Sequence, residues 1–78
     1  MITVTVVNKS SGKPAKGHKV SVYMSAFLAN GFLTPSGSEY TDSEGEVHFR
    51  GESGEGEVYV DGSVKHKGRI AGRVVVYI

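Results

Sequence analysis

The stretch that decides the fold runs from Thr41 to Arg50 and reads T-D-S-E-G-E-V-H-F-R. Its first half, Asp42 to Gly45, predicts a tight turn, because Asp and Ser side chains bond nearby backbone groups and glycine accepts a positive φ. We therefore expect Gly45 to adopt a left-handed backbone conformation. In its second half, apolar and polar residues alternate: Glu46, Val47, His48, Phe49 and Arg50. This period of two predicts a strand with one face in a core.

Strand patterns also lie on both sides of this stretch. The predicted strands are Ile2–Val7, His18–Met24, Glu39–Thr41, Val47–Arg50, Glu57–Val60, Ser63–His66 and Arg69–Ile78. Asp61-Gly62 favours a type I′ hairpin turn. We expect Lys67-Gly68 or the following residues to end one strand, Gly72 to bend the last one, and the glycine-rich segment 51–56 to be a flexible crossing. About seven short strands separated by turns predict an all-β sandwich, and no segment requires a helix.

The segment Ser25–Ser38 has no clear period. It contains four large apolar residues around Asn30-Gly31, namely Phe27, Leu28, Phe32 and Leu33. Pro35 to Ser38 is expected to loosen the chain into an irregular stretch without strand pairing. The whole segment is interpreted as a short helical turn, a hairpin tip or a loop over the end of the core. So apolar a loop either packs against the domain or contacts a partner.

Length and composition limit the function classes. The 78 residues are expected to form one domain, 1–78, and a chain this short buries only about 60% of its unfolded surface. It has no cysteine and therefore neither disulfides nor thiolate ligands. With no signal-like start, this favours the cytoplasm. The net charge of +1, with both signs scattered, does not predict nucleic-acid binding. No apolar run approaches the roughly 20 residues of a membrane helix, so no membrane contact is expected.

Three segments together resemble the carboxypeptidase regulatory-like family, which is part of the transthyretin-like (prealbumin-like) group. They are Val4–Val7, Ser11–Tyr23 and Thr41–Phe49, and the tail Gly56–Gly62 is also similar. The family shows a G-x-P-x-x-G-A-x-V connection and a T-D-x-x-G turn before a V-x-F strand. The resemblance covers most of the chain except Ser25–Ser38, and His18 stands where a small residue is usual. It implies a transthyretin-like (Greek-key) β-sandwich, and it implies no particular function.

The resemblance also raises an enzyme question, because transthyretin-like proteins include the hydroxyisourate hydrolases. These use two histidines, an arginine and a C-terminal Tyr-Arg-Gly-Ser tail. The resemblance places Thr5 at the first histidine and Glu46 at the arginine, and the chain ends Val74–Ile78 without the tail. Thr5 cannot act as a base near neutral pH, and Glu46 has the wrong charge to stabilise an oxyanion. We therefore expect no such activity.

Other chemistry has equally little support in the residue types. His18, His48 and His66 lie on separate predicted strands, without the close spacing typical of zinc ligands. The acidic residues lack the spacing of a calcium loop: Asp42, Glu44, Glu46, Glu52, Glu55 and Glu57. No serine lies in a Gly-x-Ser-x-Gly elbow. The sequence therefore predicts no catalytic residue, no metal site and no cofactor.

Two non-enzymatic functions remain. The first is a structural or protein-binding module, an accessory of a larger assembly. The alternative is a carbohydrate-binding module, since sugars stack on exposed aromatic rings. The tyrosines that could serve this are scattered over different strands: Tyr23, Tyr40, Tyr59 and Tyr77. An outward tyrosine pair beside a groove would favour sugar, and a flat apolar edge would favour a protein partner.

The last strand predicts self-association. If Val74, Val76 and Ile78 fill the core, Val75 and Tyr77 point outward on a terminal strand without Pro or Lys to protect its edge. The first strand is expected to be a similarly unguarded edge. We therefore expect a homo-oligomer, unless the Ser25–Ser38 segment covers this surface. The candidate partner surface comprises Phe27, Leu28, Phe32, Leu33, Val75 and Tyr77.

Overall fold

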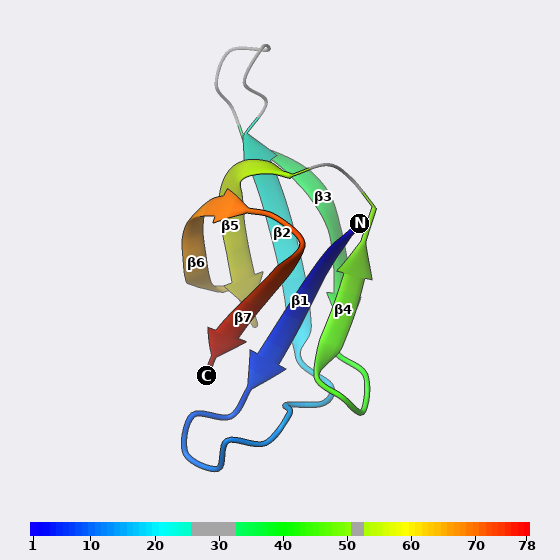
Figure 1. Cartoon of the computed structure of the whole chain (residues 1–78), viewed down its shortest axis with the longest axis vertical. Helices are drawn as coiled ribbons and strands as arrows, with labels where there is room; N and C mark the ends of the chain where they lie inside the picture. Colours follow the sequence, from blue (N-terminus) through cyan, green and yellow to red (C-terminus); the bar gives the residue numbers. More distant parts are fainter. Residues whose placement is uncertain (26–32, 51–52) are drawn as a thin grey trace.

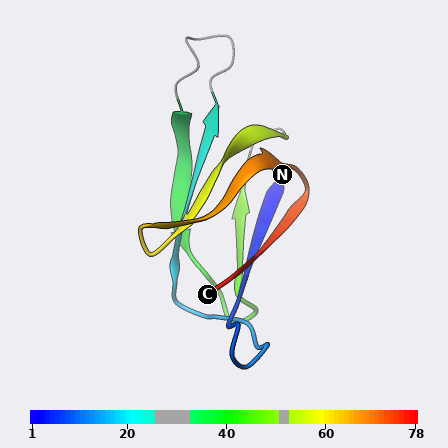
Figure 2. The ribbon, with the colours of Figure 1, turned by 90° about the vertical axis from the view of Figure 1, so that its left-hand side faces the viewer.

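The computed structural model describes residues 1–25, 33–50 and 53–78, which form seven strands (Figure 1). The strands are β1 (Ile2–Val7), β2 (Lys19–Ser25), β3 (Leu33–Tyr40), β4 (Glu46–Phe49), β5 (Gly54–Val60), β6 (Ser63–Ile70) and β7 (Arg73–Tyr77). They build two sheets, ordered β4-β1-β7 and β3-β2-β5-β6. Among these seven strands, only β1 and β7 pair in parallel. Figure 2 shows the layers from the side, with β1 and β7 on one side and β2 and β3 on the other.

The core lies between the two sheets. It is built almost entirely from aliphatic residues at alternating strand positions, as the period of two predicts. The buried apolar residues are Ile2, Val4, Val6, Ala15, Val20, Val22, Val47, Phe49, Val58, Val60, Ile70, Val74 and Val76. The alternation predicted for Val47 and Phe49 is confirmed, and so is the inward placement of Val74 and Val76.

The turn before β4 is held by its own side chains. Gly45 has a φ of 72°, so the predicted left-handed conformation is confirmed. Asp42 Oδ1 accepts the backbone N–H groups of Glu44 and Glu46 at 2.9 and 3.0 Å. The carbonyl of Gly45 accepts the N–H of Val6 at 2.8 Å, which joins the turn to β1. The turn is therefore a structural junction as well as a change of direction.

Thr41 joins this turn to the connection between β1 and β2. Its side chain is buried, and Oγ1 donates to the carbonyl of Ala15 at 2.6 Å and accepts the N–H of His18 at 3.0 Å. Its backbone bonds His18 and Gly17 at 2.9 and 3.0 Å. The connection and the turn, far apart in the sequence, thus form one hydrogen-bonded unit.

The prediction that residues 35–38 loosen the chain is wrong. They belong to β3, which pairs antiparallel with β2 from Leu33 to Tyr40. The ladder has an irregularity at Val22/Tyr23, so that one residue of β3 is unmatched between Pro35 and Gly37. Because β3 is an edge strand, a proline costs little there. The strand predicted as Glu39–Thr41 therefore begins six residues earlier, at Leu33.

Three other strand boundaries and the place of the first strand in its sheet also differ from the prediction. The strand predicted as Ser63–His66 continues through Gly68 to Ile70 as β6. Gly72 (φ 57°) is a corner between strands of different sheets, so the last strand begins at Arg73 and not at Arg69. Gly54 to Gly56 belong to β5, where a Cβ on Gly56 would collide with the Tyr23 carbonyl of β2. The first strand, β1, is the central strand of its sheet and not an edge. A glycine that permits close strand approach has the same appearance in sequence as one that ends a strand.

Candidate functional site

Val75 and Tyr77 lie on the outer face of the three-stranded sheet. The two residues are 45% and 57% exposed, so the part of the chain that the structure describes leaves them uncovered. They alternate with the buried Val74 and Val76, as predicted. The strand that carries them, β7, forms one edge of its sheet among the described strands. An exposed apolar pair therefore adjoins a sheet edge.

The pairing of β7 decides which of its backbone groups are free. The ladder with β1 begins where Thr3 N–H donates to the Gly72 carbonyl at 2.8 Å, and ends where Ile78 N–H donates to the Val7 carbonyl at 3.0 Å. In a parallel ladder every second residue bonds the same neighbour. The even-numbered residues of β7 thus bond β1, and the backbone groups of Arg73, Val75 and Tyr77 face the open edge.

A polar cluster covers the remainder of this face. Arg73 Nη1 donates to Glu46 Oε2 at 2.6 Å and to Thr5 Oγ1 at 2.9 Å, across all three strands. His48 Nδ1 bonds Thr3 Oγ1 at 3.0 Å. The register puts Thr5 opposite Glu46, so the two positions matched to hydrolase residues are neighbours. They hold a hydroxyl and a carboxylate that both bond Arg73, so this face is an ion-paired surface.

A group of potential metal ligands lies on the same side of the molecule. Asp42, Glu46 and His48 each offer an atom within 4.8 Å of the others. However, Asp42 Oδ1 accepts two backbone N–H groups, and these bonds to Glu46 and Glu44 lower the pKa of the Asp42 carboxyl. Glu46 is paired with Arg73. The local structure therefore accounts for the cluster without a metal ion.

The outer face of the four-stranded sheet carries a groove. It has a volume of about 300 Å³ and is lined by Lys19, Ser21, Tyr23, Tyr59 and Gly62. The rings of Tyr23 and Tyr59 have centroids 5.3 Å apart and planes at 79°, an edge-to-face pair. In sequence the tyrosines are scattered, but β2 and β5 are neighbours and Ser21 pairs with Tyr59, which brings the rings together. Knowledge of strand order would have been needed to find this pair.

Hydrogen bonds fix the groups around the groove. The Tyr59 hydroxyl donates to Glu57 Oε1 at 2.7 Å, and this bond raises the pKa of the Tyr59 phenol. Glu57 also faces Lys67 Nζ at 3.7 Å. Ser21 and Ser38 share a hydroxyl hydrogen bond of 2.8 Å. The Tyr59 ring is thus held at both its packed edge and its hydroxyl.

The turn beside the groove is ordered by a histidine. Asp61 and Gly62 have φ values of 52° and 85°, which fits the predicted type I′ turn. His18 Nδ1 lies 2.7 Å from Asp61 Oδ2, and Lys19 N–H donates to Asp61 Oδ1 at 3.2 Å. The bond from His18, followed by that from Lys19, lowers the pKa of the Asp61 carboxyl. His18, the departure from the family pattern, therefore holds the β5–β6 turn against β2.

The other predicted site residues that the structure describes are not brought together. His66 Nε2 donates to the Arg69 carbonyl at 2.8 Å, so the three histidines have separate partners. Phe27, Leu28 and Phe32 lie outside the described residues. Leu33 begins β3. In the described ranges no helix is long and apolar enough to cross a membrane.

Comparison with known proteins identifies the fold. No protein-family model matches the chain, and no curated protein matches its sequence. Among solved structures, the crystal structure of transthyretin from Sparus aurata is similar, with a TM-score of 0.68 and 19% identity over 97% of this chain and 85% of that one. Similarity at this level of identity concerns the fold alone. With seven strands in two sheets over its described residues, the chain is a transthyretin-like β-sandwich.

Proposed function

We propose that the chain is a non-enzymatic interaction module of the carboxypeptidase regulatory-like kind, which pairs with a second copy of itself through the open edge of β7. The family assignment is supported by the hydrogen-bonded unit that joins Thr41 to the Ala15–His18 connection. The absence of enzymatic activity is supported by residue types. Thr5 stands at the position of the first histidine of the hydroxyisourate hydrolases, and Glu46 stands at the position of their arginine. The exposed edge of β7 carries the proposal of self-pairing.

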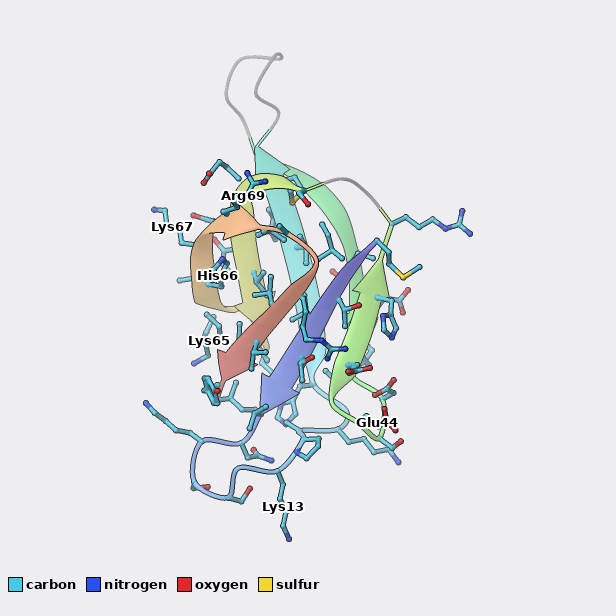
Figure 3. All side chains as sticks on the ribbon, in the orientation of Figure 1. Lys13, Glu44, Lys65, His66, Lys67 and Arg69 are labelled. Carbon is cyan, nitrogen blue, oxygen red and sulfur yellow. The ribbon has the colours of Figure 1, made fainter. Side chains whose placement is uncertain are left out.

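The edge strands of the two described sheets are not equally protected. β6 carries lysines, and Figure 3 shows Lys65 and Lys67 projecting away from the sandwich. β3 contains Pro35, and β4 has only four residues. Lysines, prolines and short strands all discourage edge pairing. β7 has neither Pro nor Lys, and its single charge, Arg73, is neutralised by Glu46. It is therefore the edge best suited to another strand.

The register of a two-fold pair follows from the backbone. The outward groups belong to Arg73, Val75 and Tyr77, so an antiparallel partner centred on Val75 lets each Val75 face its copy. Arg73 then faces Tyr77 of the second molecule. Each of these facing positions can exchange two backbone hydrogen bonds, as in any hydrogen-bonded antiparallel pair. The two three-stranded sheets would become one continuous sheet, with an isologous contact in which the same surface serves both copies.

Sedimentation velocity at tens of micromolar tests this proposal. Wild type should contain dimer, and Val75→Lys should be monomeric because two ammonium groups would meet at the two-fold axis. Val64→Lys is the matched control, since Val64 is 51% exposed on β6 and should leave the dimer intact. A monomeric wild type, or equal dimer content in Val75→Lys, overturns the proposal.

A further inference from the structure

The tyrosine groove lies over the two central strands of its sheet. β2 and β5 are each bonded on both sides, β2 by β3 and β5, and β5 by β2 and β6. Their backbone groups are therefore engaged within the sheet, and an extended peptide could not add to them as a further strand. Recognition in this groove must rely on side chains: two aromatic rings, a hydroxyl and an ammonium.

The charges beside the groove are already paired. Glu57 faces Lys67 at 3.7 Å, and Asp61 bonds His18 at 2.7 Å. Lys19 has no ion-pair partner among the residues that the structure describes, so its ammonium can donate to a ligand. The carboxylates of Glu57 and Asp61 would oppose a chain of phosphates, and single-stranded nucleic acid prefers an uninterrupted basic groove. A neutral ligand that accepts hydrogen bonds fits this environment.

The ring geometry favours a ligand with an apolar face. The edge-to-face contact and the Tyr59–Glu57 bond hold the two tyrosines in place before any ligand arrives, which lowers the entropy cost of binding. Ser21 adds a hydroxyl at the same groove. A sugar ring has an apolar C–H face and a rim of hydroxyls, so it can use both the aromatic rings and the polar groups. The volume of about 300 Å³ is at the small end of ligand sites, which limits the occupant to about one or two rings.

We propose that this groove is a binding site for a neutral saccharide, with one sugar ring against Tyr23 and Tyr59 and its hydroxyls bonded to Lys19 and Ser21. The site is on the sheet opposite to the β7 edge, so sugar binding and self-association are independent. The groove is open to solvent, and the contact area is that of one or two rings, so we expect a weak, rapidly exchanging complex.

Titration of the ¹⁵N-labelled chain followed by amide chemical shifts tests the site. The probes are neutral disaccharides of glucose, galactose and N-acetylglucosamine. At least one should shift the amides of Lys19, Ser21, Tyr23, Tyr59 and Gly62 in a saturable manner. Tyr23→Ala should weaken the affinity by about tenfold, the loss expected for one aromatic contact.

Three control variants show whether the sugar contacts this groove and which groups hold it. Tyr77→Ala removes an exposed tyrosine from the opposite sheet and should leave the sugar affinity unchanged. Tyr59→Phe keeps the ring and loses the bond to Glu57, so it should retain more affinity than Tyr23→Ala if the ring is what binds. Val75→Lys should still bind sugar even when it is monomeric. The inference is overturned if no saccharide shifts these amides, if Tyr23→Ala binds equally well, or if only a single-stranded oligonucleotide or a tyrosine-rich peptide perturbs the groove.

Discussion

Replacement of Gly45 by alanine should destabilise the domain well beyond the cost of its backbone conformation. A Cβ at Gly45 would lie 2.5 Å from the Val6 carbonyl, 3.0 Å from the Ala15 nitrogen and 3.1 Å from Pro14 Cβ. Left-handed φ in a residue with a Cβ costs about 1–2 kcal/mol. The contacted carbonyl and nitrogen form the Ala15–Val6 hydrogen bond of 2.9 Å, and a shift of the turn would also disturb the neighbouring bond of 2.8 Å from Val6 N–H to the Gly45 carbonyl. Each bond is worth roughly 0.5–1.5 kcal/mol. The expected loss is therefore about 2–5 kcal/mol.

Gly12→Ala is the matched control for this prediction. Gly12 has nearly the same φ, 71° against 72°, but among the described atoms none beyond its chain neighbours lies within 4 Å of its would-be Cβ. It should lose only the conformational cost of about 1–2 kcal/mol. Urea denaturation measures both variants against an expected total stability of about 4–12 kcal/mol for a chain of this length. Equal losses for the two variants would refute the argument that close contact with β1 and the β1–β2 connection makes Gly45 necessary.

The remaining predictions concern the strand and turn around Gly45. Phe49→Asp should unfold the domain, since it buries an unpaired carboxylate in the core. His48 is exposed, so His48→Ala should shift the melting temperature little. Similar melting temperatures for the two variants would contradict the inward placement of Phe49 and the outward placement of His48. Asp42→Asn should be less stable than wild type near pH 7, because bonds from Glu46 and Glu44 lower the pKa of Asp42 in the folded state. That stabilisation is fully present above the ordinary pKa of 3.8 and is lost as the pH falls through the lowered folded-state pKa, so the two urea midpoints should converge as the solution is acidified below pH 3.8. A difference between the two urea midpoints that stays constant with pH would contradict the stabilising role of the Asp42 charge.

Local sequence determined the strands whose inward and outward positions alternate. Val47 and Phe49, or Val74 and Val76, face the core because the side-chain period of a strand is two, which depends on no other part of the chain. The same holds for the turns at Gly45 and Asp61-Gly62, where the required positive φ restricts the residue types. The fold was therefore accessible from local patterns, together with the motifs that carry the family resemblance.

Strand order was a property of the tertiary structure alone. The pairing of β1 between β4 and β7 made β1 a central strand, although its sequence resembles an edge as much as that of β7 does. Pro35 and Gly68 both lie inside strands, because each sits on an edge strand where a lost donor or an unusual φ is tolerated. Strand propensity describes a residue by itself. The energetic cost of a proline or glycine in a strand depends on neighbouring strands, which are distant in the chain.

The candidate sites divide in the same way. The outward placement of Val75 and Tyr77 was predicted from alternation, whereas their position at an open edge needed the sheet order. The groove was not predictable, since Tyr23 and Tyr59 are brought to 5.3 Å only by the pairing of β2 with β5. Alternation fixes on which face a side chain lies. Its neighbours on that face are set by long-range register, which depends on the packing of the whole core.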